Sequence, residues 1–106
     1  MAIIGIFTRD ADGKLSGTLR TLTLNTKLQF VPEIDKTKDS APDFRIFLGH
    51  NLEAGAAWKK VGRDSGREYW SVKLDDPGFA APLYASLVET QDDNDFHLLW
   101  SRRTGD

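Results

Sequence analysis

The sequence has no cysteine among its 106 residues. This absence excludes disulfide bonds, zinc sites with thiolate ligands, iron–sulfur clusters and cysteine nucleophiles. No stretch approaches the roughly 18 apolar residues of a membrane-spanning helix. The apolar residues 2–7 meet Arg9 and Asp10 at once, so the pattern lacks the basic start and the apolar length of a signal peptide. We therefore predict a cytoplasmic protein without a membrane segment.

Positive charge is not in excess either. Fourteen Lys and Arg residues against 16 Asp and Glu residues give a formal net charge of -2. The chain therefore lacks the overall basicity typical of proteins that bind duplex DNA. A local basic strip is still compatible with this balance. The two histidines, His50 and His97, stand alone rather than at the spacing of metal ligands. We expect neither a metal nor another cofactor.

The patterns that mark common catalytic sites are missing as well. The glycines form neither G-x-x-x-x-G-K-[ST] nor G-x-G-x-x-G, and no serine lies in a G-x-S-x-G elbow. Asp75 and Asp76 precede Pro77 and Gly78, which is the composition of a turn. Acid–base catalysis needs a carboxyl group whose pKa is shifted by burial or by a close charge, and adjacent turn residues point their side chains apart. We expect a protein that is not an enzyme.

What the sequence does contain is alternation with a period of two. Short apolar segments are separated by Gly, Pro, Asn and Asp at intervals of about 10 to 12 residues, which is typical of strands joined by hairpin turns. Helical periodicity is almost absent. The chain length suits one domain. The prediction is a single all-β domain over residues 1–106, a small antiparallel meander of seven or eight strands that closes as a barrel or sandwich.

The core is predicted from the apolar residues that share one parity within each segment. In the segment 52–58 these are the even positions, which places Trp58 inward. The segment 15–24 changes parity partway, so a bulge near Arg20 and Thr21 is expected. The predicted core includes Ile4, Ile6, Leu22, Phe30, Phe44, Ile46, Trp58, Trp70, Val72, Leu74, Leu87, Leu98 and Trp100.

The hairpin of residues 58–73 is the first candidate binding surface, because it interleaves aromatic residues with cations. Small β folds bind single-stranded nucleic acid with aromatic platforms among positive charges. Alternation argues against this interpretation, since it assigns Trp58 and Trp70 to the core and leaves the cations on a solvated face. The candidate residues for nucleic acid or another partner are Lys59, Lys60, Arg63, Arg67, Tyr69 and Lys73.

Protein association is the second hypothesis. Small β domains often associate through an unpaired strand edge or an exposed aromatic patch. Tyr69, Tyr84 and Phe47 lie off the predicted inward parity and are the candidate anchors. We expect a non-enzymatic binding module and favour a protein partner, with single-stranded nucleic acid and inhibition of a host defence system as the alternatives.

Several blocks give the chain a family resemblance. The most distinctive are GAAWKK at residues 55–60, SVKLDDP at 71–77 and LWSR at 99–102. From Ala2 to Arg102 the sequence resembles an uncharacterised bacterial family, domain of unknown function 736. The resemblance implies a small proteobacterial protein encoded near conjugative plasmids and integrative elements. It supplies no catalytic residues.

Overall fold

A computed structural model describes residues 2–33, 41–49, 52–62, 66–90 and 95–101. These residues form eight strands, and the described part of the chain lacks any helix of the length and hydrophobicity that crossing a membrane requires. The strands are β1 (Ala2–Arg9), β2 (Leu15–Arg20), β3 (Asn25–Pro32), β4 (Phe44–Leu48), β5 (Leu52–Val61), β6 (Glu68–Leu74), β7 (Leu83–Glu89) and β8 (Asp95–Trp100).

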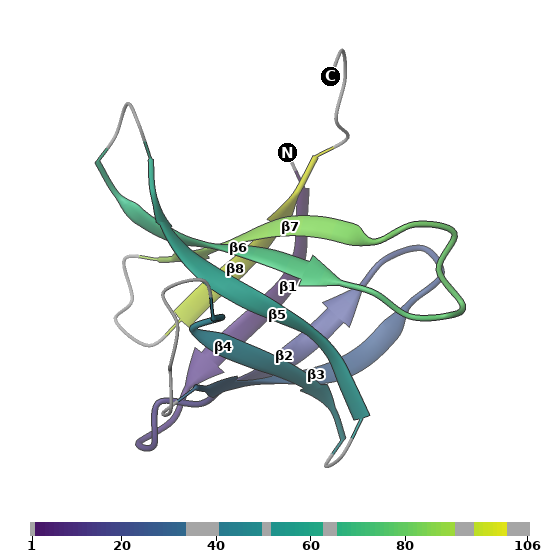
Figure 1. The fold of residues 1–106 in the computed structure, drawn as a ribbon, viewed down its shortest axis with the longest axis horizontal. Helices are drawn as coiled ribbons and strands as arrows, with labels where there is room; N and C mark the ends of the chain where they lie inside the picture. Colours follow the sequence, from purple (N-terminus) through teal and green to yellow (C-terminus); the bar gives the residue numbers. More distant parts are fainter. Residues whose placement is uncertain (1, 34–40, 50–51, 63–65, 91–94, 102–106) are drawn as a thin grey trace.

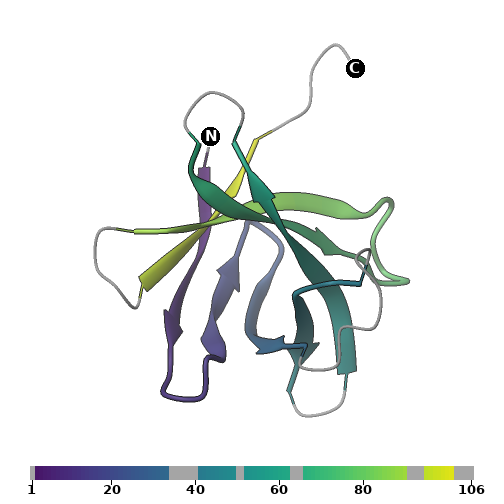
Figure 2. The same ribbon diagram turned by 60° about the vertical axis from the view of Figure 1, so that its left-hand side comes forward.

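The strands close into one antiparallel barrel (Figures 1 and 2). Their order around the barrel follows the sequence, and β1 completes the circle by pairing with β8. The all-β meander is thereby confirmed, and of the two closures that the sequence allowed the barrel is the one formed. Each of the eight strands pairs with two neighbours, so no strand lies at the edge of an open sheet. Association through a strand edge, one route of the second hypothesis, is left with short stretches only, such as the first residues of β7 beyond its pairing with β8.

The β1–β2 turn is stabilised by residues that the sequence analysis treats as typical of turns. Between β1 and β2, the Asp10 carboxylate accepts the N–H groups of Asp12 and Lys14 at 2.9 and 3.0 Å. Gly13 adopts a φ of 83°, which a residue with a Cβ adopts at a cost. The side chain and the glycine together fix the tight connection between the two strands.

Between β2 and β3 the structure corrects the sequence analysis. The expected bulge near Arg20 does not form, because β2 ends at that residue and the chain turns over residues 21–24. The Thr21 N–H donates to the Leu24 carbonyl at 2.8 Å, and the Thr21 hydroxyl accepts the Leu24 N–H at 3.0 Å. Leu22 stands in this turn with its side chain fully exposed, so its assignment to the core is wrong.

The core fills the barrel with inward side chains from all eight strands. Seven of the predicted core residues are buried, namely Ile4, Phe30, Ile46, Val72, Leu74, Leu87 and Leu98. Phe44, Trp70 and Trp100 are partly buried and pack against them. The structure adds six buried residues to the core named above, Phe7, Leu15, Leu19, Leu28, Ala57 and Phe96, of which Leu28 is inward as alternation with Phe30 predicts.

Two irregularities explain the remaining errors in the predicted core. On β1 the pairing with β8 shifts between Ile3 and Gly5, so Phe7 points inward and Ile6 is 58% exposed. On β5 the pairing with β4 passes from Glu53 directly to Gly55. Because side chains alternate with a period of two, one extra residue moves every later side chain to the other face.

The bulge on β5 is the one that matters for the binding surface. Ala54 is its extra residue, and the Ala54 carbonyl accepts the N–H of Asp75 at 3.0 Å. Beyond the bulge, Ala57 points inward and is fully buried. Trp58, the next residue, therefore lies on the outside of the barrel, and its assignment to the core is wrong.

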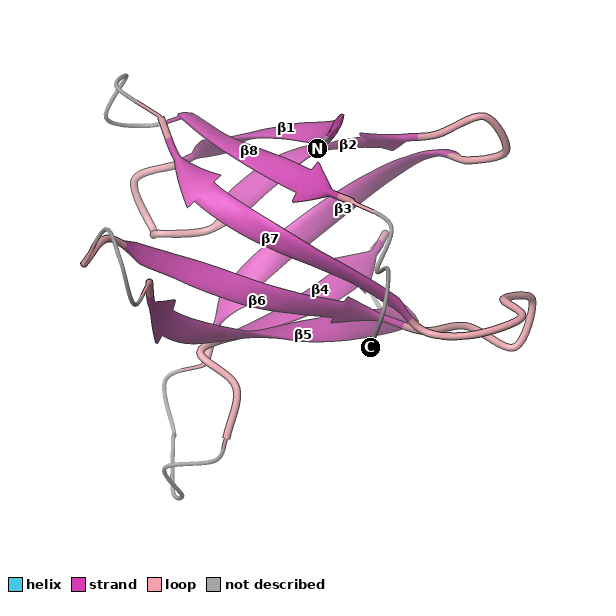
Figure 3. Cartoon of the chain, turned by 90° about the horizontal axis from the view of Figure 1, so that it is seen from above, coloured by secondary structure: helices cyan, strands magenta, loops and turns pink. Residues whose placement is uncertain are grey.

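The described turns and strand ends mark two ends of the barrel. In Figures 1 and 3 the β2–β3 turn and the β6–β7 loop lie at one end, and the end of β5 and the beginning of β6 lie at the other. Leu48 at the end of β4 and Leu52 at the beginning of β5 join the first group, because successive strands run antiparallel. We call this first group the pocket end, for the cavity described below.

Candidate binding surface

The outside of β5, β6 and β7 carries aromatic rings and cations in alternating positions. The register sets Lys60 opposite Tyr69, Trp58 opposite Ser71, and Lys73 opposite Tyr84. Residues that face each other on neighbouring strands project to the same side of the sheet. We call this surface the aromatic face, and its side chains are Trp58, Lys60, Tyr69, Ser71, Lys73, Tyr84 and Ser86.

Small side chains form the middle of the aromatic face. Ser71 pairs with Ser86, and Ser86 pairs in turn with Leu99 on β8. A groove of about 250 Å³ lies over these residues, lined by Tyr69, Ser71, Tyr84, Ala85, Ser86, Leu99 and Ser101. A short hydroxyl side chain leaves room above the sheet and offers both a donor and an acceptor. The face is therefore hollowed where the serines lie.

The tyrosines stand on opposite sides of the serine pair. Tyr69 precedes Ser71 by two positions on β6, and Tyr84 precedes Ser86 by two on β7, which runs in the opposite direction. Each ring thus lies about 7 Å along the sheet from the serines. Tyr84 is 43% exposed, and Trp58 and Tyr69 are half-buried. Tyr69 and Tyr84 line the groove, and Trp58 lies beside it as the pairing partner of Ser71.

The charge of the aromatic face is positive although that of the chain is negative. Lys60 and Lys73 project outward from β5 and β6, and Arg67 has the same parity just before β6, where its carbonyl accepts the Gly62 N–H at 2.9 Å. Among the outward residues of 56–62, 67–73 and 84–88 there is no carboxylate. The surface therefore attracts anions locally.

Glu68, the described acidic residue between Lys60 and Lys73 in the sequence, projects away from the aromatic face. Glu68 pairs with Val61 and shares the parity of Trp70, the inward one. Its Oε2 lies 2.7 Å from Lys59 Nζ, and this hydrogen bond and charge raise the pKa of Lys59. Lys59 also donates its backbone N–H to Asp43 Oδ2 at 2.7 Å. Lys59 and Glu68 thus neutralise each other away from the aromatic face.

The structure therefore divides the candidate residues of the hairpin. Lys60, Tyr69 and Lys73 come together on the aromatic face, and Arg67 continues its parity just before β6. Lys59 does not join them, and Arg63 lies outside the described residues. Of the candidate protein anchors, Tyr69 and Tyr84 belong to the same face. Phe47 projects from β4 opposite Glu53 and is not part of it.

Trp58, the two serines and Leu99 were not predicted as members of this surface. Residues 54–57 are all Ala or Gly, so no change of apolar parity marks the bulge that turns Trp58 outward. The pairing of Ser71 with Ser86 depends on the register of β6 and β7, which a single strand does not reveal. Of the histidines, His97 pairs with Val88 on β7, and His50 is outside the described residues.

Comparison with known proteins gives one family and no individual relative. Neither the search of curated proteins nor that of solved structures found a match. The family model described as "Protein of unknown function (DUF736)" matches residues 3–103, nearly the whole chain. The protein therefore belongs to the DUF736 family.

Proposed function

We propose that this protein is a non-enzymatic module that binds single-stranded nucleic acid on the aromatic face. The observation that carries the proposal is the outward position of Trp58. It pairs with Ser71, and the neighbouring outward pairs on either side contain Lys60 and Lys73. A protein partner ranked first in the sequence analysis because alternation placed both Trp58 and Trp70 in the core. This objection no longer applies to Trp58, whereas Trp70 does pack against the core.

The chemistry of the face suits a flexible anionic strand. Each nucleobase has a flat π surface that stacks on Trp or Tyr whatever its sequence, with a contribution of about 1–3 kcal/mol per base. Lys60, Lys73 and Arg67 surround the rings and supply charge for the phosphates. The serine hydroxyls in the groove donate to or accept from base edges and sugars. A duplex keeps its bases stacked inside, so it gains only the phosphate contacts.

We also propose where in the cell, and in which genetic context, the protein binds its nucleic acid. We place the protein in the cytoplasm and, following the genetic context that the family resemblance implies, among the products of mobile elements. Nucleic acid passes through a single-stranded state when such elements transfer, which would give the aromatic face its ligand. The charge of the face, not that of the whole chain, is what this function requires.

A titration at two salt concentrations tests the proposal. Fluorescence anisotropy is measured with a labelled oligothymidylate of about 16 nucleotides, the upper range for a small β barrel, and with a duplex of the same length. If three cations contact phosphates, the logarithm of the binding constant should fall against that of salt with a slope of about -2 for a single strand. Tighter binding of the single strand than of the duplex is expected.

Two sets of variants locate the site. Lys60→Glu/Lys73→Glu should abolish binding, whereas Arg20→Glu/Lys27→Glu is the matched control, because it makes the same charge change at exposed positions of β2 and β3. Tyr84→Ala should weaken binding by about 1–3 kcal/mol, and Tyr84→Phe should retain it. Equal losses from both charge pairs, or a binding constant that does not respond to salt, would overturn the proposal.

A further inference from the structure

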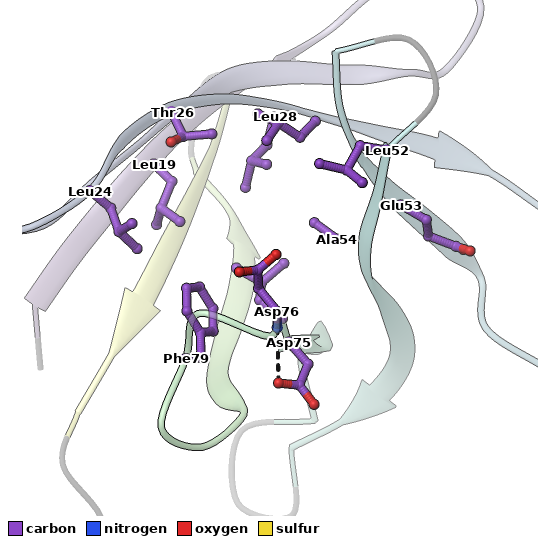
Figure 4. A pocket seen from close by; sticks show the side chains of 12 residues that line it. Leu19, Leu24, Thr26, Leu28, Leu52, Glu53, Ala54, Asp75, Asp76 and Phe79 are labelled. Atoms are coloured by element: carbon purple, nitrogen blue, oxygen red, sulfur yellow. Dashed lines mark hydrogen bonds between the residues drawn. The ribbon is translucent and has the colours of Figure 1, made fainter.

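An apolar pocket opens at the pocket end of the barrel, away from the aromatic face. It encloses about 170 Å³ between the β2–β3 turn, the paired residues Leu48 and Leu52, and the β6–β7 loop. Figure 4 shows its lining side chains converging on a common space. Eight of them are apolar, namely Leu19, Leu24, Leu28, Leu48, Leu52, Ala54, Leu74 and Phe79. The remaining lining residues are Thr26, Glu53, Asp75 and Asp76.

The pocket continues the core instead of being a surface depression. Leu19, Leu28 and Leu74 form its floor and are 3%, 5% and 2% exposed. The rim is different, because Leu48 and Leu52 are 36% and 56% exposed. Burying such side chains contributes about 25 cal/mol per Å² of apolar area. A ligand that covers the rim would therefore be stabilised by burying the apolar surface that Leu48 and Leu52 expose to water in the isolated chain.

The size of the pocket limits what enters it. An apolar cavity of about 150 Å³ in another protein holds one benzene molecule. A volume of about 170 Å³ accordingly fits a single side chain of the size of leucine or phenylalanine. It is too small for a nucleotide or a lipid chain.

The charges of the rim are all negative. Among the lining residues three are carboxylates and none is a cation. In Figure 4 the Asp76 carboxylate points toward the leucines beside the ring of Phe79, whereas those of Asp75 and Glu53 turn away. A cation next to the apolar group of a ligand would find Asp76 at the mouth of the pocket.

Short hydrogen bonds hold Asp76 and Phe79 in place. Asp76 Oδ2 accepts the N–H of Gly78 at 2.8 Å, and the Asp76 carbonyl accepts that of Phe79 at 2.8 Å. Asp75 Oδ1 accepts the N–H of Asp76 at 2.9 Å, and the N–H of Asp75 donates to Ala54 at 3.0 Å. The loop is thus tied to β5, and little ordering remains to be done on binding, which favours affinity.

We propose that this pocket binds a protein segment that presents one leucine- or phenylalanine-sized side chain next to a lysine or arginine. The apolar side chain fills the space above Leu28, and the cation lies against Asp76. Inward side chains of the strands line the pocket at one end of the barrel, whereas the aromatic face consists of outward side chains. The inference therefore stands whether or not the protein binds nucleic acid.

Short synthetic peptides are the probes. One has a central phenylalanine between two lysines, the second has glutamates in place of the lysines, and the third has alanine in place of the phenylalanine. Each is titrated into the ¹⁵N-labelled full chain, and amide chemical shifts are followed. We expect saturable shifts with the first peptide only, centred on Leu52, Asp76 and Phe79.

Two variants test the two parts of the recognition. Leu52→Ser changes an exposed rim residue and should abolish binding without unfolding the barrel. Asp76→Asn keeps an oxygen that can accept from Gly78 and should weaken binding about fivefold at low salt, as loss of an exposed ion pair does. Asp12→Asn removes a carboxylate from the β1–β2 turn at the opposite end and should change nothing.

Three results would overturn the inference. They are equal affinity for the lysine and glutamate peptides, shifts that lie outside the pocket end, and binding that survives both pocket variants. Sedimentation of the protein without peptide measures its oligomeric state, and so tests whether a second copy of the chain occupies the pocket. A dimer that Leu52→Ser dissociates would mean that a second copy, not a basic peptide, covers the pocket.

Discussion

The rings of Phe44 and Trp70 meet edge to face, with centroids 5.9 Å apart and an interplanar angle of 71°. Phe44 also contacts Phe30, and Trp70 contacts Phe96, in the same geometry. Phe7 extends the series with its contact to Phe30. Five rings from five strands thus form a continuous chain through the barrel. Each such pair adds about 0.5–1.5 kcal/mol beyond the burial of apolar area.

Replacement of Trp70 should therefore cost much of the stability of the domain. We expect Trp70→Ala to lower the free energy of unfolding by about 3–5 kcal/mol, as large-to-small changes of core aromatics do. Trp70→Phe, which keeps a ring for Phe44 and Phe96, should cost less. Leu22→Ala is the control, because its side chain is exposed, and it should stay within about 0.5 kcal/mol. Urea unfolding measures all three, and a cost under about 1 kcal/mol for Trp70→Ala would contradict the packing.

Gly55 lies directly against the backbone of β6. A Cβ at this position would lie 2.0 Å from the carbonyl oxygen of Lys73, and a backbone atom in a ladder cannot move aside cheaply. Gly55→Ala should destabilise the barrel by about 1–3 kcal/mol or more. Ala56→Ser also adds one heavy atom, but on the outside, and should have little effect. Similar unfolding midpoints for the two variants would show that the strands are farther apart than described here.

The ion pair between Lys59 and Glu68 should be visible as a pKa shift. Glu68 raises the pKa of Lys59 through a hydrogen bond and its charge, and Asp43 adds to the effect. A lysine pKa raised by folding stabilises the native state at neutral pH, and this contribution disappears as the pH rises through the raised value. Both side chains are exposed, at 49% and 54%, so the gain in stability is small.

An NMR titration of the lysine Cε signals measures this shift. In the wild-type protein the Lys59 signal should titrate above the ordinary lysine pKa, and in Glu68→Gln it should return toward it. Glu68→Gln leaves every side chain of the aromatic face unchanged. Oligonucleotide affinity should therefore change little in this variant, since it is the outward lysines that face the strand.

Alternation in the sequence predicted the fold because most strands obey it. On β6 the inward positions of Trp70, Val72 and Leu74 follow from parity alone, and they are buried or packed against the core. Barrel closure was one of two predicted outcomes, since a repeating pattern of strands says nothing about whether the first and last strands pair. The contact of β1 with β8 decides it.

The candidate sites were harder to predict, for two physical reasons. A bulge inverts the faces of a strand without leaving a mark among small residues, as at Ala54, so Trp58 was assigned to the wrong side. The apolar pocket combines residues as distant in sequence as Leu19 and Phe79. The closure of the barrel brings these residues together, and no short-range pattern in the sequence indicates it. By contrast, Tyr69 and Lys73 were found directly, because regular alternation holds along β6. Lys60 was named for its charge, and its outward position depends on the same bulge as that of Trp58.

Engineered disulfides test the bulge on β5. Arg45 pairs with Ala56 on the outside of the barrel, and the inward Phe44 pairs with Ala57. Directly opposed residues have Cα atoms about 4.5–5.5 Å apart, within the range of a disulfide bond. The natural sequence has no cysteine, so Arg45→Cys/Ala56→Cys should form a single cross-link on mild oxidation.

The discriminating partner is Arg45→Cys/Ala57→Cys, which should stay reduced because the two side chains project to opposite faces of the sheet. A regular β5, with Trp58 inward, would reverse this outcome, since Ala57 would then share the outer face with Arg45. Peptide mapping by mass spectrometry under non-reducing conditions reads the result. A cross-link through position 57 and none through position 56 would return Trp58 to the core and remove the main support for nucleic-acid binding on this face.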